Sequence, residues 1–269
     1  MPLPSPEAVA TIVAEVAAEE IVPRFGHLRA DEVSDKNPGD PVTVADVAAE
    51  KALSRRLKDL LPGSVVVGEE AVEADAGLLD LLKGDDPVWI IDPVDGTTNF
   101  AAGLPLFATI IGLARKGEML LACLHDPIHR KTALACAGDG ATLNGEACRV
   151  AAPSEPKNMY GTVKLRFGER GLPETIIKNC QNVPPFIDLR CAAVEYMALA
   201  TGALHYALYR KLKPWDHAAG NLLHTEAGGF SAHLDGGPYA VTGPDISHGF
   251  LSAPDESSWH ALVEALTGD

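Results

Sequence analysis

The most informative stretch of the chain is Trp89-Ile90-Ile91-Asp92-Pro93-Val94-Asp95-Gly96-Thr97-Thr98-Asn99-Phe100. Its first residues are strongly apolar, as in a buried strand, and two aspartates follow closely. Ligands bind beyond the carboxyl ends of strands in α/β sheets, so carboxylates delivered there predict a site. Gly96-Thr97-Thr98 predicts the start of a helix, whose free N–H groups attract phosphate oxygens. The alternative is a purely structural Asp-Gly turn capped by threonine.

A second apolar run also ends in acidic residues. It reads Val65-Val66-Val67-Gly68-Glu69-Glu70, and adjacent glutamates repel each other unless water or a cation lies between them. Alone, this pair fits a solvated surface as well as a metal site. Together with Asp92 and Asp95 it predicts a cluster of hard oxygen ligands suited to Mg²⁺, which prefers carboxylates and carbonyls to imidazole or thiolate.

The rest of the chain predicts a mixed α and β protein. A helix begins at Ser5-Pro6, and a second one, with Val47, Leu53, Leu57 and Leu60 on its buried side, ends at Pro62-Gly63. The polar stretch 29–41 predicts a mobile loop. Strands are expected at 65–67, 88–91, 107–114 and 119–124, hairpin turns at Lys116-Gly117 and Asn144-Gly145, and further helices at 192–201, 217–225 and 257–266. A soft boundary near residue 150 predicts subdomains at 1–150 and 151–269.

The charge of the chain restricts its partners. The 22 basic and 37 acidic residues among 269 give a net charge of −15, which repels nucleic acid and anionic membranes. The hydrophobic fraction of 46% argues against disorder. An anionic substrate would need a local positive charge, which a cation bound by clustered carboxylates would supply.

The cysteines and the absence of targeting segments predict a cytoplasmic protein. The five cysteines are widely spaced and include no Cys-x-x-Cys pair, as expected for buried thiols in a reducing compartment. Residues 1–25 lack a cationic leader, and no apolar run approaches the roughly 18 residues that a membrane span needs.

Several blocks of the sequence resemble those of one known family. They are Gly68-Glu69-Glu70, Asp92-Pro93-Val94-Asp95-Gly96-Thr97-Thr98-Asn99, Trp215-Asp216-His217-Ala218-Ala219-Gly220, Glu226-Ala227-Gly228-Gly229 and the upstream Asp40-Pro41-Val42-Thr43-Val44-Ala45-Asp46. Together, and in the order in which they follow one another along the chain, they resemble the inositol monophosphatase family within the magnesium-dependent, lithium-sensitive phosphatases. The match spans most of the chain.

The resemblance implies a fold, an activity and a set of site residues. The fold is α/β (α+β), a layered αβαβα sandwich of the inositol monophosphatase and fructose-1,6-bisphosphatase type. The activity is phosphate monoester hydrolysis on a small phosphorylated polyol, most simply inositol monophosphate, by water attack without a covalent phosphoenzyme. Family members are often homodimers. The implied metal ligands for two or three Mg²⁺ ions are Glu69, Asp92, the Val94 carbonyl, Asp95 and Asp216. The residues implied to orient the water are Asp46, Glu69 and Thr97. Those expected to bind substrate are Asp95, Gly96, Thr97, Thr98, Ala192 and Asp216, with Ala192 and Ala193 matching a small-residue pocket wall. Arg210 is added to this set because of its charge and not because of the resemblance.

The sequence departs from the family where inositol hydroxyls are commonly held. A glutamate expected seven residues before Asp216 is replaced by Tyr209, and the basic cluster Arg210, Lys211 and Lys213 follows. This cluster is either a solvated loop or a pocket for a second phosphate, since Arg and Lys bind phosphate directly. In the second case fructose 1,6-bisphosphate, a nucleotide bisphosphate such as adenosine 3′,5′-bisphosphate, or NADP compete with inositol phosphate as substrates; histidinol phosphate is a further alternative.

A few residues keep two interpretations. Asp216 is also placed to cap a helix N-terminus, His217 is interpreted as a packing residue, and the role of Glu195 is open. Lys36 either approaches the substrate or a third ion, or is a solvated loop lysine.

Two other functions compete with the leading one. Asp-x-x-Asp-Gly-Thr resembles the nucleophile loop of haloacid-dehalogenase-type phosphatases, although its spacing is one residue too long. A regulatory binding protein without catalysis is the alternative from a different class. The presence of every expected metal carboxylate argues for an active enzyme.

Overall fold

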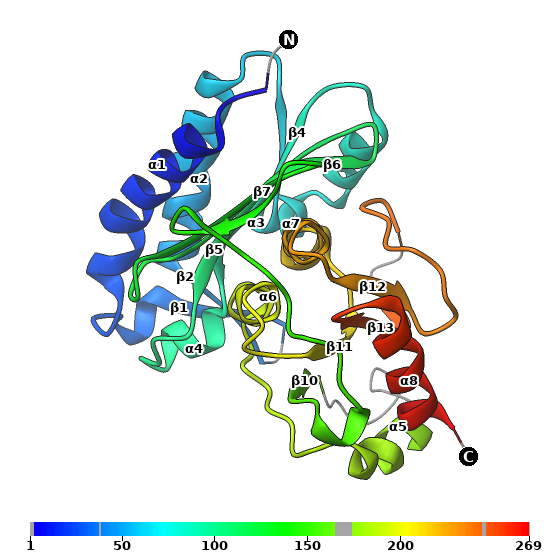
Figure 1. The fold of residues 1–269 in the computed structure, drawn as a ribbon. Coiled ribbons are helices and arrows are strands. Elements are labelled where there is room, and N and C mark those ends of the chain that lie inside the picture. The colour runs from blue at the N-terminus through cyan, green and yellow to red at the C-terminus, as the bar shows by residue number, and fades with distance from the viewer. Residues whose placement is uncertain (1–2, 38, 165–173, 244–245, 269) are drawn as a thin grey trace.

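Two β-sheets alternate with three layers of helices in the computed structural model (Figure 1). The structure describes residues 3–37, 39–164, 174–243 and 246–268. Helices α1 and α2 cover one face of the large sheet, and α6 and α7 lie between the two sheets. Helices α5 and α8 cover the far face of the small sheet (Figure 1). The order of layers is therefore αβαβα, as predicted. The helix bounds are α1 Pro6–Val16, α2 Val44–Leu60, α3 Glu69–Ala74, α4 Thr97–Ala101, α5 Glu174–Asn179, α6 Ala192–Ala200, α7 Pro214–Glu226 and α8 Glu256–Thr267.

The large sheet has the order β3-β4-β5-β6-β7-β8-β9. Only its first pair, β3 and β4, is parallel; the other pairs are antiparallel. This parallel pair places the carboxyl ends of β3 and β4 side by side, and both acidic motifs follow those ends. The strands are β3 Val65–Gly68, β4 Val88–Asp95, β5 Ala108–Arg115, β6 Glu118–Asp126, β7 Lys131–Cys136, β8 Gly140–Leu143 and β9 Glu146–Ala147.

The small sheet has the order β10-β11-β13-β12, with β10 and β11 parallel and the other pairs antiparallel. A separate antiparallel ribbon pairs β1 with β2. All strands of the large sheet precede residue 150 and all strands of the small sheet follow it. The division into subdomains at this residue stays a prediction. The strands are β10 Gly161–Val163, β11 Tyr206–Lys211, β12 Phe230–His233, β13 Ile246–Ala253, β1 Val33–Asn37 and β2 Asp40–Thr43.

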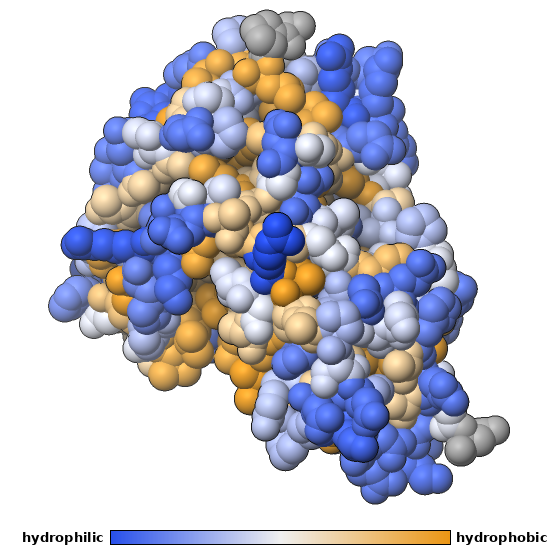
Figure 2. Space-filling view, in the orientation of Figure 1, coloured by the Kyte–Doolittle hydropathy of each residue, from blue (hydrophilic) through white to orange (hydrophobic). Residues whose placement is uncertain are grey.

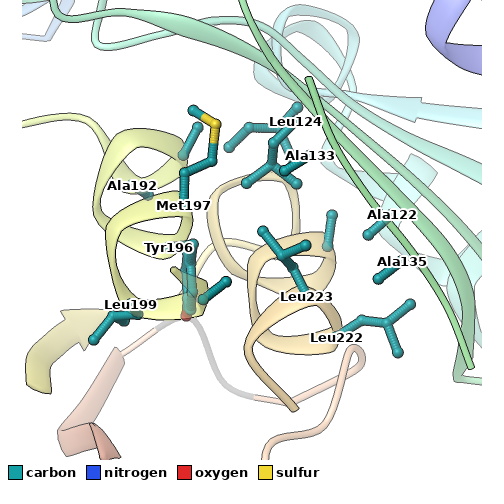
Figure 3. Packing of buried hydrophobic residues seen from close by; sticks show 14 of the residues in the cluster. Ala122, Leu124, Ala133, Ala135, Ala192, Tyr196, Met197, Leu199, Leu222 and Leu223 are labelled. Atoms are coloured by element: carbon teal, nitrogen blue, oxygen red, sulfur yellow. The ribbon is translucent and has the colours of Figure 1, made fainter. Parts of the chain in front are cut away.

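Both faces of the large sheet are buried, which explains its apolar strands. Ile111 and Leu113 pack toward α1 and α2, whereas Ile110 packs toward α6 and α7. Successive residues of a strand point to opposite faces, so an almost continuous apolar run fills both layers. Figure 3 shows small side chains of the sheet, such as Ala122 and Ala135, next to Leu222 and Leu223 of α7.

Helices α6 and α7 approach closely at Gly220. A methyl group added there would lie 2.0 Å from the Tyr196 ring, and that ring is fully buried. We therefore expect Gly220→Ala to destabilise the protein by about 1–3 kcal/mol in urea unfolding. A gain of roughly 1 kcal/mol, which alanine brings to an open helix position, would show that the two helices do not pack here.

Most predicted elements are present, with local corrections. The strands, the turns at Lys116-Gly117 and Asn144-Gly145 and the main helices are confirmed; Lys116 and Asn144 have positive φ angles of 56° and 51°. Val47 is 55% exposed, so its predicted burial is wrong: the buried side of α2 runs through Ala49 and Leu53 instead. Strand β1 and the first two residues of β2 lie within the predicted loop at 29–41.

The surface and the cysteines agree with the composition. Figure 2 shows mostly hydrophilic side chains over the corner formed by α5 and α8. All five cysteines are free thiols, and Cys136 is the one that is partly exposed. Within the described residues, no helix combines the length and the apolar character that crossing a membrane requires.

Candidate active site

A cavity of about 160 Å³ lies where β3 and β4 end. A larger hollow of about 340 Å³ beside β8 and β9 has one acidic lining residue, Glu146, among the described residues, so the acidic cluster belongs to the smaller cavity. The residues that line the smaller cavity are Gly39, Asp40, Pro41, Glu69, Asp92, Val94, Asp95, Gly96, Thr97, Thr98, Arg190, Lys211, Trp215 and Asp216.

Two aspartates at the end of β4 form the floor of the cavity. Asp92 is 2% exposed and accepts a hydrogen bond from the Val94 N–H at 3.1 Å. Burial raises its pKa well above the ordinary value, and the nearby charges of Glu69, Asp95, Asp216 and Asp46 raise it further. Its side chain is therefore a buried carboxylate facing other carboxylates, an arrangement that favours a bound cation.

Asp95 is held from the opposite side, by the start of α6. Its Oδ2 accepts hydrogen bonds from the Ala193 N–H at 2.6 Å and from Cys191 Sγ at 3.2 Å. Burial raises its pKa, although these bonds oppose the rise. Ala192, predicted to bind substrate, is buried in this turn and is not one of the described residues that line the cavity.

Gly96 makes the turn from β4 into α4. Its φ is 91°, and a Cβ atom there would lie 2.8 Å from the Leu106 carbonyl oxygen, so both the conformation and the space require glycine. Asn99 Nδ2 fixes the turn by donating to the carbonyl oxygens of Leu106 and Leu189, both at 2.8 Å.

Glu50 of α2 positions the Gly68-Glu69-Glu70 segment. Its two carboxylate oxygens accept the N–H groups of Glu70 and Ala71, at 2.8 and 2.9 Å. A Cβ atom on Gly68 would lie 2.4 Å from the Glu50 carboxyl carbon. Glycine at 68 therefore makes room for the carboxylate that holds the start of α3, next to Glu69.

Lys36 of the β1–β2 ribbon lies between the two glutamates. Its Nζ is 3.0 Å from Glu69 Oε1 and 2.6 Å from Glu70 Oε1, and its side chain is 7% exposed. Burial alone would lower the lysine pKa, but the attraction of Glu69 and Glu70 outweighs it and the pKa is raised. The interpretation of Lys36 as a solvated loop lysine is therefore wrong.

Asp46 is linked to the cavity by a hydrogen bond from Thr97. Its Oδ2 accepts from the Thr43 N–H at 2.9 Å and from the Thr43 hydroxyl at 2.5 Å. The Thr97 hydroxyl lies 3.1 Å from Asp46 Oδ1 and 2.9 Å from the Val94 carbonyl oxygen. Burial raises the Asp46 pKa to about 6, against the hydrogen bonds from Thr43. Asp46 itself is fully buried, and Thr97 lines the cavity.

Asp216 belongs to α7, which packs on the face of the large sheet opposite to α2. Burial and the charges of Glu69 and Asp95 raise its pKa to about 8. The residue that caps α7 is Lys213, with Asp216 in the first turn, so the interpretation of Asp216 as the cap is wrong. Behind it, the buried His217 Nδ1 lies 3.1 Å from the Tyr196 hydroxyl oxygen. Burial lowers the His217 pKa to about 3, as suits a packing residue.

The basic residues divide into those that reach the cavity and those that do not. Lys211 lines it, whereas Arg210, although described, does not. Lys213 Nζ lies 5.4 Å from the centre of the Trp215 ring. Tyr209, at the position of the expected inositol-binding glutamate, is 1% exposed and packs against His217 instead of facing the cavity.

Comparisons with known proteins fit this geometry. Residues 6–266 match the model of the Inositol monophosphatase family. The chain belongs to the inositol monophosphatase family. An inositol-1-monophosphatase of Rhizobium meliloti (strain 1021) is 32% identical over 256 residues, covering 93% of this chain and 91% of the relative. The Nus factor SuhB of Escherichia coli (strain K12) is 32% identical, covering 87% of this chain and 88% of the relative.

A solved structure agrees as well. The crystal structure of the extragenic suppressor protein SuhB from Bartonella henselae has a TM-score of 0.80 at 27% identity, covering 97% of this chain and 99% of that one. Family membership confirms the predicted fold class and the predicted class of enzyme, a phosphoric monoester hydrolase. The haloacid-dehalogenase type is not the family that the chain matches.

The donor set of the inositol monophosphatase signature fits a hard divalent cation. It offers carboxylates and the Val94 carbonyl, without imidazole or thiolate. Within the described residues, no group of three acidic, histidine or cysteine side chains is arranged to hold a metal ion. Carboxylates around an open, polar cavity suit an ion that keeps several of its waters, as Mg²⁺ does.

Some residues at the site were missed by sequence reasoning. Arg190 and Asp40 line the cavity, Glu50 supports Glu69, and Lys164 pairs with the buried Glu195, whose role the sequence leaves open. Asp40 belongs to the block that precedes α2, and nothing in that block distinguishes it as a residue of the cavity. Arg190 precedes the turn that holds Asp95, but the sequence carries no pattern that distinguishes it from a surface arginine.

Proposed function

We propose that the protein is a Mg²⁺-dependent phosphatase of small phosphorylated polyols, with inositol monophosphate as the simplest substrate. The observation that supports this most directly is the set of carboxylates from β4, the start of α3 and α7 around one cavity. Their pKa values are raised where the groups face one another, as for Asp92 and Asp216. Such a cluster repels a phosphate unless cations are bound in it.

The residues that would hold Mg²⁺ are Glu69, Asp92, Asp95, Asp216 and the Val94 carbonyl. Bound there, the ion would supply a positive charge that lowers the pKa of a water molecule and stabilises the leaving oxygen. The Thr97 hydroxyl donates to Asp46 Oδ1 or to the Val94 carbonyl oxygen, which leaves its lone pairs free to accept a hydrogen bond from a water molecule. Thr97 would thus orient the attacking water, and Asp46 would hold Thr97 in that orientation. The N–H groups at the start of α4 and the Thr98 hydroxyl would contact the phosphate.

The test of this function is phosphate release from inositol 1-phosphate and p-nitrophenyl phosphate, with Mg²⁺ and with EDTA. We expect release that requires Mg²⁺ and is inhibited by Li⁺ through competition for an ion position. Release that is unchanged in EDTA would contradict the metal chemistry. A covalent aspartyl-phosphate, trapped with a fluoroberyllate, would contradict water attack.

The metal-free protein is expected to lose stability as the pH rises. The pKa values of Asp46 and Asp216 are raised in the folded protein, to about 6 and about 8, above their unfolded values near 4. Between these values the folded state binds more protons than the unfolded state, so stability falls with rising pH. In EDTA, Tm should therefore drop from pH 5 to pH 8, and Mg²⁺ should raise Tm more at pH 8.

The magnesium response has an informative control. Asp126→Asn alters a buried carboxylate at the end of β6, outside the cavity, and should keep the full response of Tm to Mg²⁺. An equal response to Mg²⁺ at pH 5 and pH 8 would contradict the assignment of the ion to protonatable carboxylates.

One relative bears a name that favours a second function. The E. coli relative is a Nus factor, so a role as a binding partner is the alternative to catalysis. A protein that binds Mg²⁺ but releases no phosphate from any monoester would support that alternative. Homodimer formation and cytoplasmic location remain part of the proposal.

A further inference from the structure

Two cations lie at the mouth of the acidic cavity. Arg190 and Lys211 line it together with the carboxylates, and both are exposed, whereas Asp92 and Asp95 are buried at its floor. No described carboxylate lies within 4.0 Å of the charged nitrogens of either side chain. Both positive charges are therefore available to an anion that enters the cavity.

Arg190 is held in an uncommon conformation. Its φ is 53°, in the left-handed region that residues with a side chain rarely adopt. Asp188 Oδ1 accepts the Arg190 N–H at 3.0 Å. The guanidinium reaches over the start of α4, where Nη2 lies 3.5 Å from the Thr98 hydroxyl oxygen. The Arg190 side chain therefore lies at the exposed edge of the cavity, near the start of α4.

An ionic network around the buried Glu195 supports this turn; the side chains of its partners Lys164 and Asp188 are 27% and 40% exposed. Glu195 is fully buried, and its Oε1 accepts the Lys164 Nζ at 2.7 Å and the Leu189 N–H at 3.2 Å. Lys164 also donates to Asp188 Oδ1 at 2.9 Å. Burying such a pair costs desolvation energy that an apolar pair would avoid. The network instead ties residues 188 and 189 in place, immediately before Arg190.

Lys211 approaches from the small sheet. It is the last residue of β11, which lies between β10 and β13 in that sheet. Arg190 and Lys211 come from different segments and border the same cavity as Asp216 and Thr98. A guanidinium and an ammonium that border one cavity can both bind a phosphate group directly.

We propose that Arg190 and Lys211 form a subsite for a second phosphate group, so that the preferred substrate carries two. The proposal rests on the proposed function, because the carboxylates and their Mg²⁺ serve the phosphate that is hydrolysed. The two cations lie at the mouth of the cavity and not at its floor. A second phosphate, on another atom of the substrate, would lie at this mouth.

The test compares substrates that differ by one phosphate. The pairs are inositol 1,4-bisphosphate with inositol 1-phosphate, and adenosine 3′,5′-bisphosphate with adenosine 3′-monophosphate. In at least one pair, the wild type should prefer the bisphosphate in kcat/KM by about 10-fold, the effect of one or two charge-assisted hydrogen bonds. Arg190→Ala and Lys211→Ala should each remove most of this preference. Each should change kcat/KM for the monophosphate by less than about 3-fold. Lys51→Ala, an exposed lysine on α2, is the matched control and should change neither.

Each other outcome is decisive. Equal losses of kcat/KM for the bisphosphate and the monophosphate would mean that the cations bind the scissile phosphate. A wild type that does not prefer the bisphosphate in either pair would also overturn the subsite. If no compound is hydrolysed, the proposed function fails, and calorimetric binding of the bisphosphates with Mg²⁺ present decides the subsite alone. The Kd must then rise about 10-fold in Arg190→Ala and stay unchanged in Lys51→Ala.

Discussion

Replacing Asp92 by asparagine is expected to lower kcat/KM for phosphate monoesters by a factor on the order of 10³ or more. Asp92 lies at the end of β4, and its carboxylate interacts with those of Glu69, Asp95 and Asp216. Asparagine has nearly the same shape and can still accept the Val94 N–H, but it removes a negative charge that the bound cation requires. The loss should therefore be chemical and not structural.

The stability of this variant separates the two causes. Because Asp92→Asn removes one of several mutually repelling buried charges, the metal-free variant should match or exceed the Tm of the wild type at pH 8. Asp126→Asn, at the end of β6, should retain normal turnover. Near-normal activity of Asp92→Asn, or inactivity caused by unfolding, would remove Asp92 from the site.

The largest effect on stability is expected from Lys164→Met. Lys164 Nζ lies 2.7 Å from Oε1 of Glu195, whose side chain is 0% exposed. Removing the lysine leaves a buried carboxylate without its counter-charge, which costs about 3–5 kcal/mol in the free energy of unfolding at pH 8. Urea unfolding followed by circular dichroism measures this change.

The pH dependence identifies Glu195 as the cause. Burial already raises its pKa, and loss of Lys164 raises it further above the unfolded value. The penalty is therefore full above the folded pKa and shrinks as the pH falls and Glu195 takes up a proton. Adding Glu195→Gln should restore most of the stability at pH 8. A penalty that is independent of pH, or no rescue in the double variant, would contradict an ionic origin.

The acidic side of the site was predictable because its residues lie in contiguous motifs. Asp92, Asp95 and Thr97 follow one apolar strand, and Glu69 follows another. The structure brings them to one cavity because β3 and β4 are parallel neighbours, so both motifs leave the sheet at the same edge.

The basic side was not predictable in the same way. Sequence reasoning selected Arg210, but the pairing of β11 with β13 shifts between Tyr209 and Lys211, so simple alternation does not tell which side chain faces the cavity. Arg190 depends on contacts among Lys164, Asp188 and Glu195, which are distant in the sequence and leave no local pattern. Tertiary contacts, and not propensities, decide this half of the site.

The position of α7 between the two sheets has a consequence for folding. Asp92 and Asp95 belong to the large sheet, but Asp216 belongs to α7, which follows β11 and precedes β12 of the small sheet along the chain. Contacts this distant in sequence form slowly, because loop closure must precede them. Full affinity for the cation should therefore appear only at the last docking step of refolding, and the ion itself would serve as a kinetic reporter that assembly is complete.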